Sequence, residues 1–344
     1  YLLNSLGREN GDCVSSFTLP CRILSLRTRT DIMQTREFLI GMIFISLTII
    51  GVLGNFTLLY QYICFYITRY RLRSTDWVLM HMVVANILTV LCKGVPQTIS
   101  YFGFEDFLND IGCKLVFYVH RLCRGACLGS TSFLSVFQAI VISPRISRYP
   151  EFKVRTLKCI CYSVYLNWVF YSFISSVFIV NMRAKCGNES ATKLKSFIYC
   201  YSVKHDPTSD MLYATLLTFP DMLLLGLMLW ASSSMVLMLY RHKQMIQYMS
   251  KTSVSSRSSP ESRATKTILL LVSTFVSFST ISSIFHFSIA LVYSPSWLMV
   301  NMSSMSTLLF PTVCPFLLMI QDSRASSYLK RNRYFPKASD QEQN

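Results

Sequence analysis

Long apolar stretches separated by short polar connections dominate the chain. A helix needs about 20 mostly apolar residues to cross a bilayer. By that measure we predict seven membrane-spanning helices, at residues 38–67, 77–99, 112–142, 157–180, 211–240, 265–293 and 297–320. The pattern therefore predicts an all-α membrane protein in which a seven-helix bundle occupies residues 38–320, without an internal repeat.

The sixth stretch has a clear start signal. Ser259 can cap a helix, Pro260 suits its first turn, and Glu261 favours its positive end. The polar run 250–259 before it, SKTSVSSRSS, is typical of a connecting loop. We therefore expect a helix to begin at this point.

Composition supports a membrane protein. Hydrophobic residues make up 52% of the chain, charged residues only 15%, and the mean hydropathy is +0.39. Soluble proteins carry about a quarter charged residues. The net charge of +16 does not indicate nucleic-acid binding, because the basic residues form short clusters between apolar runs and not a stripe with stacking aromatics.

The distribution of Lys and Arg predicts the orientation. If the N-terminus lies outside, the cytoplasmic connections and tail hold 18 of these residues and the outside segments hold 10. Positive residues favour the cytoplasmic side, so we predict an extracellular N-tail at 1–37 and a cytoplasmic tail at 321–344. Met33 precedes the first apolar stretch, and we interpret it as a natural start, with residues 1–32 as upstream translation.

Two features fit the outer side. Asn188 begins an Asn-Glu-Ser glycosylation sequon in the long segment 181–210. Cys113, at the outer end of the third span, could form a disulfide with Cys200 or with Cys186; we favour Cys200. The outside of the cell is oxidising, which permits such a bond.

The chain shows no pattern that predicts a metal or another cofactor. Its 12 Cys mostly lie within apolar runs without zinc-type spacing, and its five His are scattered. A single acid inside the spans offers no carboxylate pair for catalysis. An enzyme is therefore not expected.

Several residues resemble those of rhodopsin-like G-protein-coupled receptors. Gly54-Asn55 in the first span, Pro220 in the fifth and Pro315 in the seventh fall where that class has the same residues. Other positions depart from the class. Asn86 stands in place of Asp, Phe137-Gln138-Ala139 in place of Asp-Arg-Tyr, and the Cys-Trp-x-Pro of the sixth span is missing.

These departures resemble one family, the vomeronasal type-1 receptors. The strings that carry the resemblance are HRLCRGACLGSTSFLSVFQAIVISPR (120–145), LMLWASSSMVLMLYRHKQ (227–244), SSPESRATKTILLLVSTFVSF (258–278) and FPTVCPFLLM (310–319). The resemblance covers residues 33–335. It implies a multi-pass protein of the plasma membrane that detects small pheromone-like molecules and signals through an inhibitory-class heterotrimeric G protein.

Charged residues in the third span are unexpected, because charge inside a bilayer is costly. Helical geometry places His120, Arg121 and Arg124 at about 0°, 100° and 40° around the axis, so they share one arc. We predict that this arc faces the bundle interior, with His120 about 10 Å and Arg124 about 16 Å below Cys113. That depth is the outer half of the bundle.

Asp221 is the only acid well inside a predicted span, and its depth in the fifth span matches that of Arg124. One interpretation is an Arg124–Asp221 ion pair that fixes helix register. The other is contact with a ligand, and both can hold together. Two Arg against one Asp leave a positive surplus, which favours an anionic ligand.

We take six interior residues as candidate ligand contacts: His120, Arg121, Arg124, Asp221, Lys93 and His286. Lys93 would add positive charge from the second span. His286 is the weakest candidate, since a lone His on an apolar helix is more often a core residue with a satisfied hydrogen bond.

The cytoplasmic side suggests a G-protein surface. Without Asp-Arg-Tyr, we take Gln138, Arg145 and Arg263 as candidate contacts there. The basic residues also follow from topology alone. The expected partners are a small-molecule ligand, a G protein and membrane lipid. The alternative function is a seven-span transporter or channel, although the sequence lacks the repeat symmetry and broken helices common in those proteins.

Overall fold

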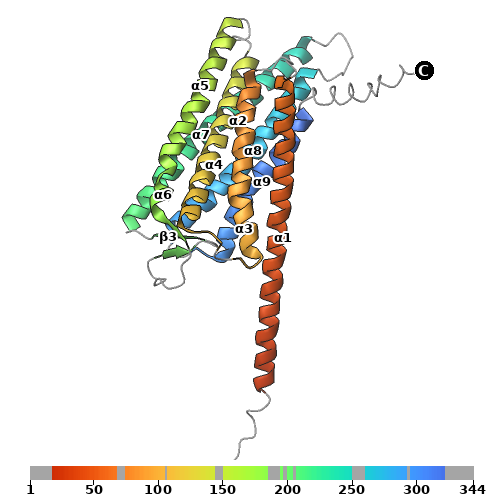
Figure 1. The fold of residues 1–344 in the computed structure, drawn as a ribbon. Coiled ribbons are helices and arrows are strands. Elements are labelled where there is room, and N and C mark those ends of the chain that lie inside the picture. The colour runs from red at the N-terminus through yellow and green to blue at the C-terminus, as the bar shows by residue number, and fades with distance from the viewer. Residues whose placement is uncertain are drawn as a thin grey trace, which may run out of the picture.

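The computed structural model describes residues 18–67, 74–104, 107–143, 150–184, 194–196, 200–203, 207–249, 260–292 and 295–321. Within these ranges, seven helices are long and apolar enough to cross a membrane. They form an elongated bundle (Figure 1). The predicted seven-helix membrane fold is therefore confirmed.

Ten helices and three short strands are present in the described residues. The helices are α1 (Thr18–Ile67), α2 (Ser74–Thr89), the π-helix η1 (Val90–Gly94), α3 (Val95–Tyr101), α4 (Asp110–Ile142), α5 (Pro150–Ser175), α6 (Val177–Asn181), α7 (Pro207–Met249), α8 (Pro260–Leu291) and α9 (Trp297–Gln321). The strands are β1 (Met182–Ala184), β2 (Leu194–Ser196) and β3 (Cys200–Val203).

Three helix boundaries bear on the sequence predictions. Helix α8 begins at Pro260, as the start signal predicted. Helix α1 begins at Thr18, well before its apolar portion at Thr35–Ile67, and extends beyond the bundle (Figure 1). Helix α5 ends at Ser175, earlier than predicted, because the Ser176 hydroxyl and amide both donate to the Phe173 carbonyl and tighten the turn.

The second span is made of α2, η1 and α3 in sequence. Pro96 has no N–H to donate to the carbonyl of Cys92, four residues earlier, and the helix accommodates this with a π turn at Val90–Gly94. Gly94 lets α1 approach this turn, since a Cβ there would lie 2.3 Å from the Thr48 hydroxyl oxygen. Lys93 is part of this π turn and is buried in the bundle.

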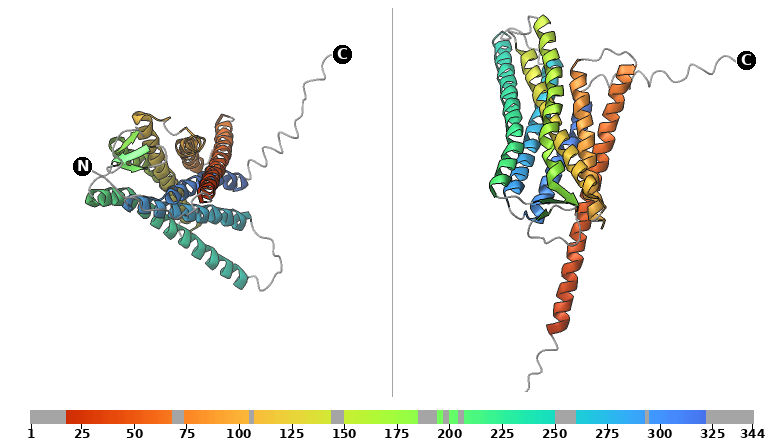
Figure 2. Two further views of the ribbon diagram at one scale, coloured as in Figure 1. Left: turned by 90° about the horizontal axis from the view of Figure 1, so that it is seen from below. Right: turned by 60° about the vertical axis from the view of Figure 1, so that its left-hand side comes forward.

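Helix α4 lies at the centre and packs against α2, α5 and α7 (Figure 2). Small residues let α5 approach it closely. A Cβ at Gly125 would lie 2.0 Å from the Tyr171 ring, and one at Gly129 would lie 2.4 Å from the Asn167 side chain. Without these two glycines, the helices could not pack at this distance.

The first and last spans share a polar contact inside the membrane. Pro315 cannot donate to the carbonyl of Pro311, and the Asn55 amide donates to that carbonyl at 2.8 Å instead. A Cβ at Gly54 would approach Pro315 to 3.1 Å. Gly54, Asn55 and Pro315, which pointed to the rhodopsin-like class, therefore form one structural unit.

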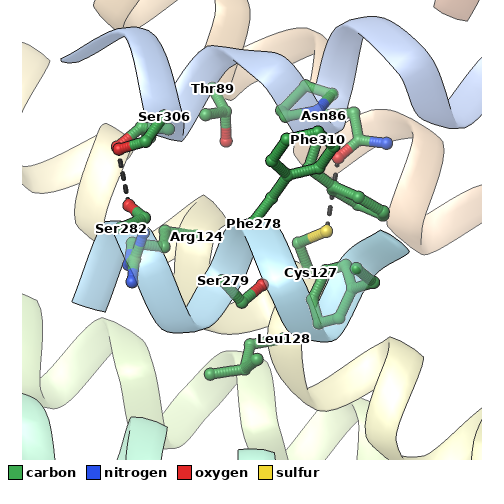
Figure 3. A pocket seen from close by; sticks show the side chains of 13 residues that line it. Asn86, Thr89, Arg124, Cys127, Leu128, Phe278, Ser279, Ser282, Ser306 and Phe310 are labelled. Atoms are coloured by element: carbon green, nitrogen blue, oxygen red, sulfur yellow. Dashed lines mark hydrogen bonds between the residues drawn. The ribbon is translucent and has the colours of Figure 1, made fainter. Parts of the chain in front are cut away.

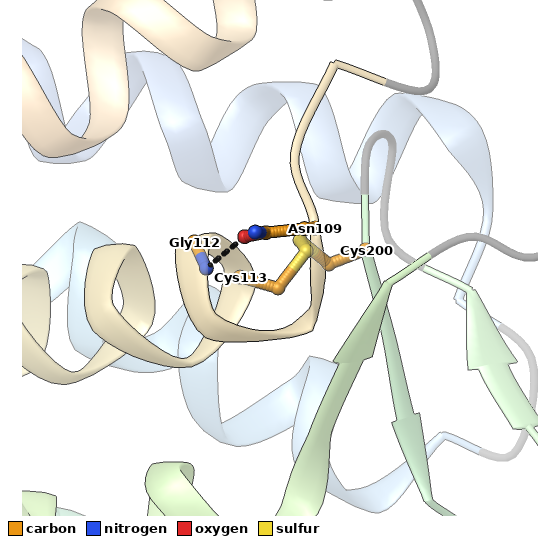
Figure 4. Close-up of a disulfide and its surroundings, with 4 residues drawn as sticks. All are labelled: Asn109, Gly112, Cys113 and Cys200. Atoms are coloured by element: carbon orange, nitrogen blue, oxygen red, sulfur yellow. Dashed lines mark hydrogen bonds between the residues drawn. A yellow bond between two sulfur atoms is a disulfide. The ribbon is translucent and has the colours of Figure 1, made fainter.

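The outer end of the bundle carries a small antiparallel sheet of order β1-β3-β2. A disulfide joins Cys113, in the first turn of α4, to Cys200 at the start of β3 (Figure 4). Asn109 caps α4 beside it by accepting from the Gly112 amide at 2.8 Å. The favoured pairing is confirmed, and it ties the sheet to the central helix. Cys186 and Asn188 lie outside the described residues.

Candidate ligand-binding site

The six candidate ligand residues lie on four spans around one interior region. Helix α4 contributes His120, Arg121 and Arg124, and the other three are Lys93 in η1, Asp221 in α7 and His286 in α8. His120, Arg121, Lys93 and Asp221 are buried, and only 11% of the Arg124 side chain is exposed. The prediction that the charged arc of the third span faces the bundle interior is therefore confirmed.

Arg121 and Asp221 form the closest ion pair of the site. The two guanidinium Nη atoms donate to the two carboxylate oxygens, at 2.8 and 3.0 Å. Arg121 also donates to the Leu217 carbonyl, one turn before Asp221. Tyr171 completes the arrangement, since its hydroxyl donates to Asp221 at 2.8 Å and its ring lies 5.5 Å from the guanidinium carbon. Helices α4, α5 and α7 are joined here.

Arg124 has a looser set of partners. Its Nη atoms donate to the hydroxyls of Ser282 at 2.5 Å and Ser283 at 2.7 Å, both on α8. Its Nε lies 3.6 Å from Asp221. The predicted Arg124–Asp221 pair is thus present but secondary. Arg121 makes the two short contacts with the carboxylate, and Arg124 turns toward α8.

The two histidines lie side by side, with ring centroids 6.3 Å apart. His286 Nε2 is 3.2 Å from the Thr307 hydroxyl oxygen on α9, as expected of a core histidine with a hydrogen bond. His120 Nε2 is buried and has no hydrogen-bond partner in the described part of the chain. Lys93 Nζ lies 5.8 Å from the centre of the Phe117 ring. His120 thus offers an unused polar atom beside the arginines.

A cavity of about 40 Å³ adjoins Arg124. Figure 3 shows it between helices of the second, third, sixth and seventh spans. Its walls are formed by Asn86, Thr89, Arg124, Cys127, Leu128, Phe275, Phe278, Ser279, Ser282, Ser306, Thr307, Phe310 and Pro311. The space is much smaller than the roughly 300–1,000 Å³ of a typical ligand pocket.

Sequence reasoning missed four contacts of this site: Tyr171, Ser282, Ser283 and Thr307. Only Tyr171 had a signal, because Gly125 and Gly129 on the charged helix predict a close neighbour. Serines and threonines are common in spans, where their hydroxyls can bond to their own helix. Nothing in their spacing distinguishes the ones that bind arginine.

The three candidate G-protein contacts are only partly described. Gln138 lies on α4, half-buried, and its buried Oε1 has no hydrogen-bond partner within the described ranges. Arg145 lies outside the described residues. Arg263 is in α8, but its side chain is not described. Their role stays a prediction.

Comparison with known proteins adds independent support. Residues 38–331 match the family described as "Vomeronasal organ pheromone receptor family". The chain is 46% identical to human vomeronasal type-1 receptor 4 over 84% of its own length and 96% of the relative's. It is 43% identical to human vomeronasal type-1 receptor 3, over 89% and 99% of the two lengths. It is 31% identical to rat vomeronasal type-1 receptor 90, over 84% and 92%.

These relatives are named as receptors and not as enzymes. Together with the seven spans, they indicate a multi-pass protein of the plasma membrane. A receptor of this kind has a ligand and a G protein as its general partners. The chain belongs to the vomeronasal type-1 family of vomeronasal organ pheromone receptors, with the seven-span architecture of G-protein-coupled receptors.

Proposed function

We propose that this chain detects small pheromone-like molecules, with a preference for anionic ones, and activates an inhibitory-class heterotrimeric G protein. The observation that carries the ligand preference is the charge of the interior site. Arg121 and Arg124 share one carboxylate, Asp221, and both arginines are almost completely buried. A buried positive surplus favours a ligand with a carboxylate, sulfate or similar group.

Arg124 is the arginine best suited to meet such a ligand. Arg121 already uses both Nη atoms on Asp221 and one of them on Leu217, whereas the short hydrogen bonds of Arg124 go to neutral hydroxyls. An anion can replace those hydroxyls at a gain, since it adds the attraction between two opposite charges, which is stronger inside a protein than in water. His120 Nε2, which has no hydrogen-bond partner among the described residues, can add a second polar contact nearby.

The site must open to admit a ligand, because the cavity beside Arg124 holds only about 40 Å³. A ligand that binds a more open arrangement of the helices shifts the balance toward that arrangement, by no more than its differential affinity for the two. Moving Arg124 away from Ser282 and Ser283 would free α8 from α4. That release is the step by which we propose ligand binding reaches the cytoplasmic side.

The test is guanine-nucleotide exchange on an inhibitory-class G protein. The chain would be expressed from Met33, its surface level measured, and membranes exposed to a panel of steroid conjugates, neutral steroids and small volatiles. We expect exchange that requires both receptor and ligand, with acidic ligands preferred. Receptor at the surface that responds to no ligand, or a ligand-gated current or uptake without exchange, would contradict the proposal and favour a channel or transporter.

A further inference from the structure

The cavity beside Arg124 has a charge imbalance that the described side chains do not resolve. Asp221 binds Arg121 through both oxygens and also accepts from Tyr171, while Arg124 Nε stays 3.6 Å away. One carboxylate is thus shared by two guanidinium groups. A buried charge without a counter-charge costs several kcal/mol in proteins.

Among the described residues, none of those that line this cavity is acidic. Apart from Arg124, its polar lining consists of hydroxyl, amide and thiol groups, from Asn86, Thr89, Cys127, Ser279, Ser282, Ser306 and Thr307. In Figure 3 the hydroxyls of Thr89 and Ser279 face the space from opposite sides. Helix α2, which contributes Asn86 and Thr89 to the lining, has one carboxylate, Asp76. It lies ten residues before Asn86 and so about 15 Å away along the axis.

The size of the cavity restricts what can enter. One water needs about 10–15 Å³ of such space, so a cavity of about 40 Å³ holds roughly three waters, or a single small ion with some water. A pheromone-sized molecule does not fit. Water can satisfy the hydroxyl groups, but it cannot balance the charge of Arg124.

We infer that the cavity binds one small inorganic anion, of which chloride is the most abundant in extracellular fluid. Arg124 supplies the charge, and lining donors such as the Ser279 hydroxyl complete the site. The ion would act as the counter-charge for Arg124 when no ligand is bound. It would stabilise the arrangement in which Arg124 joins α4 to Ser282 and Ser283 on α8.

The test uses no pheromone and no G protein, so its outcome is independent of the proposed function. The full chain, in lipid nanodiscs, would be unfolded by heat in sodium chloride, sodium bromide or sodium gluconate at equal ionic strength. Gluconate is too large for the cavity. We expect Tm to rise by a few degrees in chloride and bromide, saturating with concentration, because a ligand that binds only the folded state stabilises it. Equal Tm values in chloride and gluconate would overturn the inference.

Variants then locate the ion. Asn86→Asp puts a carboxylate in the cavity wall, and we expect it to abolish the chloride effect by supplying the counter-charge itself. Asn167→Asp is the matched control, since Asn167 is also buried but does not line the cavity; its chloride effect should persist. Ser279→Leu fills the same space with an apolar group and should also abolish the effect. A chloride effect that survives in both Asn86→Asp and Ser279→Leu would place the ion elsewhere and refute the site.

Discussion

Two arginines of the central helix α4 contact neighbouring helices through different kinds of partner. Toward α7, Arg121 meets a carboxylate at 2.8 and 3.0 Å, and a tyrosine from α5 fixes that carboxylate. Toward α8, Arg124 meets two serine hydroxyls. The first contact joins opposite charges in a fixed geometry, whereas the second joins a charge to neutral groups.

This difference indicates a structural role for Arg121 and a role in the response to ligand for Arg124. Breaking the Arg121–Asp221 pair would leave charges buried without a partner, which is strongly destabilising. Replacing the serine hydroxyls at Arg124 by an anionic group of a ligand would instead give the guanidinium an opposite charge to pair with. We therefore interpret the α4–α7 contact as the fixed part of the bundle and the α4–α8 contact as the part that a ligand can release.

The largest expected effect comes from Asp221→Asn. It leaves Arg121 and Arg124 buried without their shared carboxylate. Loss of one partner of a buried ion pair costs about 3–5 kcal/mol, so we expect a low Tm and poor surface expression. Surface labelling and thermal unfolding measure this. A variant with normal surface level and Tm would show that the pair is not the fixed contact.

Gly125→Ala should have an intermediate effect. Its Cβ would lie 2.0 Å from the Tyr171 ring and displace the tyrosine that fixes Asp221. Overpacking of this kind costs about 1–3 kcal/mol, which would be read as a lower Tm. Gly226→Ala on α7 is the matched control, because a Cβ there meets no atom within 4 Å. Equal Tm values for the two variants would contradict the close packing of α4 and α5.

The smallest effect on stability is expected from Ser283→Ala, which removes one hydroxyl from Arg124. Arg124 keeps Ser282 and its contact with Asp221, so the cost should be no more than about 1.5 kcal/mol, the lower end of the range for a hydrogen bond to a charged group. Since the α4–α8 contact weakens, we expect basal nucleotide exchange to rise at equal surface expression. Unchanged or lower basal exchange would argue against α8 release.

The sequence predicted much of this architecture. Apolar length alone located the seven spans, and the cost of charge in a bilayer correctly placed His120, Arg121 and Arg124 inside the bundle. The favoured Cys113–Cys200 disulfide is also present. These features depend on local composition and spacing, which a sequence displays directly.

The choice of ion-pair partners could not be predicted in the same way. Arg121 and Arg124 differ by about 60° around α4 and by about 4.5 Å along it, so either long side chain can reach one carboxylate. The position of α7 along α4 decides which arginine pairs with Asp221. That position depends on tertiary packing, which includes the contact of the Tyr171 ring with Gly125 and the hydrogen bond from Tyr171 to Asp221. The π turn at Val90–Gly94 did have a sequence signal, in Pro96.

The most direct measurement compares Arg124→Gln with Arg121→Gln in ligand-driven nucleotide exchange, at matched surface expression. The account predicts that Arg124→Gln weakens the response to acidic ligands by about tenfold or more, since about 1.4 kcal/mol corresponds to tenfold, and leaves neutral ligands largely unaffected. Arg121→Gln should instead lower Tm and surface level, with little change in ligand preference among the receptors that reach the surface. The account would be contradicted if Arg124→Gln responded to acidic ligands as strongly as the unaltered chain does, with the response to neutral ligands also unchanged.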